Sequence, residues 1–100
     1  MEFDDIVRHL RSTGWEFRIT GANALTSNVR GEKGVYLLIV AFQRERDLIR
    51  IAAQLHDRIP PERSVDMLRL AAHINWGRDI AACDYEPHSG IVRFRAAIPV

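Results

Sequence analysis

The segment VYLLIVAFQ, from Val35 to Gln43, decides the fold of this chain. Its longest apolar run, Val35 to Phe42, is apolar at odd and even positions alike, so an extended strand here presents apolar side chains on both faces. The run is far shorter than the ~20 residues of a membrane-spanning helix. Gly31-Glu32-Lys33-Gly34 precedes it as a hairpin connection, and Arg44-Glu45-Arg46 follows it as a turn into a second strand, Asp47 to His56.

The length of the turn after Gln43 decides which residues of these two strands share a face. An even number of turn residues puts Leu38, Val40 and Phe42 on one face with Ile49 and Ile51, and we expect that face to be the core. The opposite face then carries a second apolar set with polar residues among it: Val35, Leu37, Ile39, Ala41, Leu48, Ala52, Arg50 and Gln54. Monomers rarely expose such a patch.

We therefore predict that this second face is an interface, either for self-association or for docking of a partner. The candidate interface residues are Leu37, Ile39, Leu48 and Ala52. Two alternatives stay open: a loop covers the patch, or an odd turn reverses the two faces. Replacing Ile39 with Asp separates these readings, because it disrupts an interface without unfolding the chain but unfolds a core.

The N-terminal part predicts a helix followed by a hairpin. The apolar residues Phe3, Ile6, Val7 and Leu10 have helical spacing, which predicts a helix from about Glu2 to Thr13. The period then changes to two, and Trp15, Phe17 and Ile19 predict a half-buried strand. Gly21-Ala22-Asn23 is a turn, and a polar strand with Leu25 and Val29 continues to Arg30.

The C-terminal part predicts a second helix and a second hairpin. Pro60-Pro61 ends the sheet, and the following helix, which ends at Gly77, is predicted to be largely buried. Its apolar positions are Met67, Leu68, Leu70, Ala71, Ala72 and Ile74. Strands from Asp79 to Glu86 and from Ile91 to Ala97 flank the turn Pro87-His88-Ser89-Gly90. The fold class predicted is α+β: an antiparallel sheet built from hairpins, with both helices on one face.

Composition narrows the class of protein. One hundred residues with 47 % hydrophobic content suit a single globular domain, residues 1–100, and a net charge of +1 predicts no strong attraction to nucleic acid or to a membrane. The lone cysteine, Cys83, excludes an internal disulfide. The acidic start of the chain, Met1 to Asp5, lacks a signal peptide's apolar segment, so we expect a cytoplasmic protein.

A search for chemistry predicts no catalytic, cofactor or metal site. His9, His56, His73 and His88 lack short ligand spacing, and Cys83 is expected to be a buried structural thiol. No serine lies in a nucleophile elbow. Arg93 and Arg95 share a strand face from which Phe94 points away, which is atypical of a nucleic-acid stacking platform. We therefore expect neither an enzyme nor a nucleic-acid partner.

The second half of the chain carries a family resemblance. Its segments are Ile59-Pro60-Pro61, Leu68-x-x-Ala71-Ala72-x-Ile74-Asn75, Ile80 to Tyr85 and Ser89 to Pro99. They resemble the YbjN-like family of small bacterial domains, which is similar to the chaperone fold of type III secretion systems. The leading helix and the Gly14-Trp15 entry to the sheet agree more loosely.

The resemblance implies a helix–sheet–helix–hairpin layout, dimers and a regulatory or chaperone-like role, with no known enzymatic activity and no catalytic residues to transfer. Family members usually continue into a further helix, whereas this chain stops at Val100, and we expect more of the sheet to be uncovered as a result. Secretion chaperones tend to be acidic and this chain is slightly basic, so a partner other than a secreted effector is expected.

The leading prediction is a homodimeric, non-enzymatic interaction module, adaptor or chaperone-like, that buries an apolar sheet face or pairs at a strand edge. The alternative is a sensory domain that binds a small ligand between the helices and the sheet. His73, Asn75 and Trp76, at the end of the second helix, are the candidate ligand cluster. A ligand bound there should change the fluorescence of Trp76.

Overall fold

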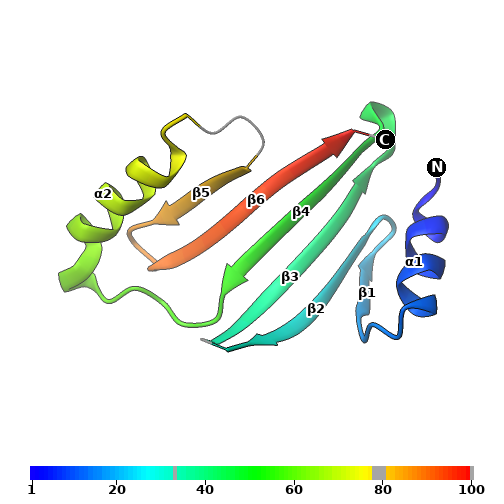
Figure 1. Cartoon of the computed structure of the whole chain (residues 1–100), viewed down its shortest axis with the longest axis horizontal. Helices are drawn as coiled ribbons and strands as arrows, with labels where there is room; N and C mark the ends of the chain where they lie inside the picture. The colour runs from blue at the N-terminus through cyan, green and yellow to red at the C-terminus, as the bar shows by residue number, and fades with distance from the viewer. Residues whose placement is uncertain (33, 78–80, 100) are drawn as a thin grey trace.

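The computed structural model describes residues 1–32, 34–77 and 81–99, and in this part of the chain two helices accompany a six-stranded antiparallel sheet (Figure 1). The elements are α1 (Phe3–Ser12), β1 (Arg18–Gly21), β2 (Ala24–Gly31), β3 (Gly34–Gln43), β4 (Leu48–Leu55), α2 (Ser64–Asn75), β5 (Ala81–Glu86) and β6 (Ile91–Pro99). Short 3-10 turns, η1 (Arg44–Arg46) and η2 (Pro61–Arg63), follow β3 and precede α2. The predicted fold class is confirmed.

The strands are ordered β1-β2-β3-β4-β6-β5, and each neighbouring pair is antiparallel. Gln43 pairs with Leu48, so residues 44 to 47 form an even turn. Asp47 closes this turn in the left-handed region, with φ of 49°. The even turn aligns Val40 with Ile51, which confirms the predicted division of the two faces.

Both helices cover the same face of the sheet. Under α1, the buried residues of the first core cluster are Phe3, Val7, Leu25, Val40 and Phe42. Under α2, those of the second cluster are Ala71, Cys83 and Val92. The register places the strand residues of both clusters on one face, because directly paired residues, and residues two apart along a strand, share a face. In Figure 1 the helices lie at opposite ends of the sheet, α1 beside β1 and α2 beside β5.

The first helix is held by a single apolar stripe and by contacts at both of its ends. Glu2 and Asp5 form a capping box at its start, and Glu2 also contacts Arg44 at 3.1 Å. The strand predicted from Trp15 instead begins at Arg18, because the chain leaving α1 is still tied to the helix through the Trp15 amide, which donates to the Leu10 carbonyl. Phe17 nevertheless packs against the first cluster.

The second helix departs from the prediction that it is largely buried. Only Ala71 is buried in α2, while Met67 and Ile74 pack partly against the second cluster. Leu70, which was predicted to face the core, is 51 % exposed. The prediction was wrong because apolar residues surround more of this helix than one sheet face can cover.

The hairpin between β5 and β6 is locked to the segment that precedes α2. The Ile59 amide donates to the Gly90 carbonyl at 2.8 Å. Gly90 has φ of 76°, and a Cβ at this position would collide with the Ile59 backbone. Both features require glycine here.

Two sequence predictions fall partly outside the described residues: Lys33 in the first hairpin, and residues 78–80 at the predicted start of the strand from Asp79. No helix among the described residues is long and apolar enough to cross a membrane.

Candidate functional site

The side of the sheet that points away from the helices is the candidate site, and we call it the open face. It is formed by the side chains that alternate with those of the core. Its central residues are Leu37, Ile39, Ala41, Leu48, Arg50, Ala52, Gln54, Ala82, Asp84, Arg93, Arg95, Ala97 and Pro99. All four predicted interface residues therefore lie on this face, where they are half-buried.

A hollow of about 740 Å³ lies on the open face, over β3, β4, β6 and β5. Small side chains on neighbouring strands leave this space, because Ala52 and Ala82 both flank Arg95, and Ala97 lies opposite Arg50. The apolar lining from this face consists of Ile39, Ala41, Ala52, Ala82, Ala97 and Pro99. Of the predicted interface residues, Ile39 and Ala52 line this hollow, while Leu37 lines a second, smaller hollow near Arg18 and Asn28.

Three arginines, Arg50, Arg93 and Arg95, also line the larger hollow. Each is held by a neighbour on the same face. Arg50 Nε donates to Gln43 at 3.0 Å, Arg93 Nη2 donates to Gln54 at 2.9 Å, and Arg95 Nε donates to Asp84 at 2.6 Å. These contacts fix the positions of the guanidinium groups, each of which carries further N–H donors.

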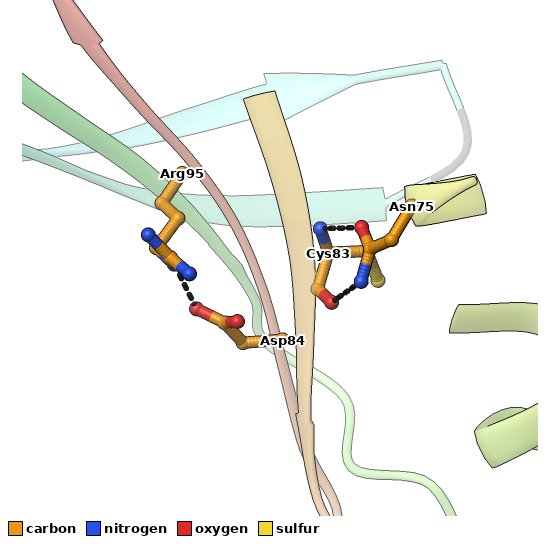
Figure 2. Close-up of polar contacts among 4 residues, drawn as sticks. All are labelled: Asn75, Cys83, Asp84 and Arg95. Atoms are coloured by element: carbon orange, nitrogen blue, oxygen red, sulfur yellow. Dashed lines mark hydrogen bonds and ion pairs between the residues drawn. The ribbon is translucent and has the colours of Figure 1, made fainter. Parts of the chain in front are cut away.

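The two sides of β5 make different polar contacts, as Figure 2 shows. On one side, the Asn75 amide pairs with the backbone of Cys83: Asn75 Nδ2 donates to the Cys83 carbonyl at 2.8 Å, and the Cys83 amide donates to Asn75 Oδ1 at 2.6 Å. On the other side, Asp84 points to Arg95. Since the N–H and C=O of one strand residue point the same way, Asn75 occupies the edge of β5 that faces away from β6.

The predicted ligand cluster at the end of α2 lies outside the two hollows described above. Asn75 is engaged with β5, His73 is exposed, and Trp76 is 87 % exposed. Neither of the two hollows described above includes any of these residues. The three side chains are thus neighbours in sequence that line neither of these hollows.

The thiol of Cys83 lies inside the second core cluster and is only 2 % exposed. Burial, together with the nearby charge of Asp84, raises the pKa of Cys83 above its ordinary value. Both effects favour the neutral thiol, which is a poor nucleophile. Within residues 1–32, 34–77 and 81–99, no three His, Cys, Asp or Glu side chains gather as metal ligands would.

The sequence model of the YbjN family, described as "Putative bacterial sensory transduction regulator", matches residues 2–100. The chain belongs to the YbjN family. No curated protein matches it. The family assignment confirms the resemblance carried by the C-terminal motifs.

Sequence reasoning placed Arg93 and Arg95 on one strand face, away from Phe94, but missed the hollow between them and Arg50. A signal was present: Ala52 shares its strand with Arg50, and Ala97 shares its strand with Arg93 and Arg95. Its meaning depends on the pairing of β4 with β6, which brings Arg95 beside Ala52 across 43 residues of sequence. Nothing in the local pattern specifies that pairing.

Proposed function

We propose that this member of the YbjN family is a non-enzymatic protein-interaction module with a regulatory role, adaptor or chaperone-like, and that it works as a homodimer. The observation that carries the proposal is the exposed surface of α2. Val65, Leu68 and Trp76 of this surface are all more than one-third exposed, and Leu70 adds a further exposed apolar side chain. Helices of soluble monomers rarely present so much apolar surface to water.

The charges on α2 favour a second copy of the chain as the occupant of this surface. Asp66 is exposed in the first turn of the helix, Arg69 is exposed at its middle, and His73 is exposed in its last turn. If two copies pack antiparallel about a two-fold axis, the acidic first turn of each helix lies beside the last turn of the other, which carries His73. Such a surface is self-complementary, as an isologous interface requires.

The open face is less suited to self-association than the exposed surface of α2. Its hollow is lined by Arg50, Arg93 and Arg95, and a two-fold axis through it would bring two sets of arginines together. Like charges placed opposite each other oppose association. We therefore assign self-association to α2 and leave the open face to a different occupant.

Light scattering over a dilution series tests this assignment. The wild-type chain should have the mass of a dimer, and Leu68→Asp should have the mass of a monomer at the same concentrations. Ile39→Asp, on the open face, is the matched control and should remain dimeric. Circular dichroism of each variant reports whether the fold is kept.

Two results would overturn the assignment, and a third would require another variant. A wild-type monomer at every concentration removes the homodimer. Dissociation by Ile39→Asp with Leu68→Asp still dimeric places self-association on the open face. Loss of the fold in Leu68→Asp shows that Leu68 is a core residue, and Trp76→Ser then serves as the substitute at an 87 % exposed position.

A further inference from the structure

We propose that the hollow of the open face binds an amphipathic organic anion, a molecule with a carboxylate or phosphate group on an apolar body. The hollow has a volume of about 740 Å³. Binding sites for small molecules generally have volumes of roughly 300–1,000 Å³ and combine an apolar lining with a few fixed polar groups. The proposal goes beyond the homodimeric interaction module and is independent of it.

The charges around the hollow indicate that its ligand carries an anionic group. Arg50, Arg93 and Arg95 line it, and in the part of the chain that the structure describes, Asp84 is the carboxylate paired with one of them. The guanidinium fork suits carboxylates and phosphates, with which it forms bidentate hydrogen bonds. Because Gln43, Gln54 and Asp84 already position the arginines, less side-chain entropy is lost on binding.

The apolar side chains at the bottom of the hollow, which we call its floor, indicate that the ligand also has an apolar body. Ile39 and the alanines Ala41, Ala52, Ala82 and Ala97 provide apolar surface between the guanidinium groups. A fully hydrated inorganic anion would gain nothing from that surface, whereas an alkyl or similar group removes it from water. The ligand should therefore be held at its charged end by arginine and along its length by the floor.

A nucleic acid fits this face less well. The strand aromatics Tyr36, Phe42, Tyr85 and Phe94 all lie on the helix-covered face, according to the register. The described strand residues of the open face include no aromatic side chain on which a base could stack. The arginines thus serve a discrete anion with an apolar body better than a single strand.

Isothermal titration calorimetry with defined probes tests the proposal on the intact chain. The probes are dodecanoate, dodecyl phosphate, dodecyltrimethylammonium and inorganic phosphate, each below its critical micelle concentration where it has one. Both dodecyl anions should bind, and the cation and inorganic phosphate should bind at least tenfold more weakly. The relative affinity of the two dodecyl anions identifies which acidic group the arginines prefer.

Variants locate the site. Arg95→Gln and Arg50→Gln should each weaken dodecanoate binding about tenfold, and Ala52→Leu should weaken it by filling the floor. Arg30→Gln removes the same charge from β2, outside the hollow, and should leave the affinity unchanged. Circular dichroism and thermal unfolding show whether each variant keeps the fold.

The proposal is overturned if no dodecyl anion binds, if the cation binds as tightly as the anions, or if Arg30→Gln weakens binding as much as Arg95→Gln. Equal affinity for inorganic phosphate and dodecyl phosphate would also overturn it, because the floor would then contribute nothing. Repeating the titration with Leu68→Asp separates the two proposals: binding by a monomer leaves this site standing while self-association is lost.

Discussion

The two helices pack on the same face of one sheet, yet they stabilise it very differently. The first helix buries Phe3 and Val7 in a cluster that includes Leu25, which is fully buried. The second, although longer, buries only Ala71. The α2 cluster also contains the buried hydroxyl of Tyr85, for which no hydrogen-bond partner is found among the described residues.

The difference teaches that a helix's apolar content does not by itself measure its contribution to the core. In α1 the apolar residues form one stripe, in which Phe3 and Val7 are buried and Ile6 and Leu10 are partly buried against the sheet. In α2 they extend around the helix, so the sheet covers one side and the other side is exposed. Apolar side chains thus build the core at the α1 end and remain exposed at the α2 end, where we propose that a second copy covers them.

The largest expected loss of folding free energy comes from a substitution in the core cluster under α1. Leu25→Ala removes a fully buried side chain and leaves a cavity, and we expect it to lower the free energy of unfolding by about 3 kcal/mol. Val92→Ala, in the α2 cluster, removes fewer atoms from a smaller core and should cost about half of that. Urea unfolding followed by circular dichroism measures both. An equal or larger loss for Val92→Ala would show that the α2 end is not the weaker core.

A smaller effect is expected in the turn that joins β5 to β6. Gly90→Ala adds a Cβ against the Ile59 backbone at positive φ, and should lower the free energy of unfolding by about 2 kcal/mol. Gly14, which follows α1, is the matched control: its φ is 81°, but a Cβ there meets nothing within 4 Å. Gly14→Ala should therefore cost only about 1 kcal/mol, from conformation alone. Equal losses would mean that the contact with Ile59 adds no constraint.

The smallest expected effect is a pH-dependent contribution to stability from Glu86, in the same turn. Hydrogen bonds from Ser89, and also from the His88 amide, hold the pKa of Glu86 below its ordinary value. A lowered folded-state pKa means that the carboxylate stabilises the fold above the ordinary pKa and that this contribution is lost as the pH falls through the folded-state pKa. The difference in melting temperature between the wild type and Glu86→Gln should thus be present at neutral pH and disappear in acid. A difference that grows in acid would contradict this assignment.

Much of the fold followed from local patterns in the sequence. The apolar run from Val35 to Phe42 indicated two apolar sheet faces, whose partners the even turn in the structure then decided, and the prolines at 60 and 61 located the break before α2. The exposure of Leu70 and the later start of β1 did not follow. The first depends on how much of α2 the sheet covers, and the second on the hydrogen bond that ties Trp15 to the end of α1, and neither is visible in the local period.

The candidate site was only partly predictable for a related reason. The alternation of side chains along two strands joined by an even turn places four residues on one face: Leu37, Ile39, Leu48 and Ala52. The hollow needed the long-range pairing of β4 with β6, because arginines and alanines alternate across strands that are distant in sequence. The role of Asn75 as a partner of the Cys83 backbone was likewise invisible, since an asparagine near a helix end is most simply interpreted as part of the cap.

The bond between Asn75 and Cys83 has a consequence for how the protein behaves at high concentration. A sheet's outer strand is a template on which further chains can add and grow into insoluble aggregates. The amide of Asn75 occupies the N–H and C=O of Cys83 in the middle of β5, so one margin of the sheet is blocked to strand addition. The other margin is β1, which is only four residues long and carries an irregular register at Ile19 to Gly21. This chain can therefore keep one broad face of its sheet uncovered without recruiting copies of itself into a fibre.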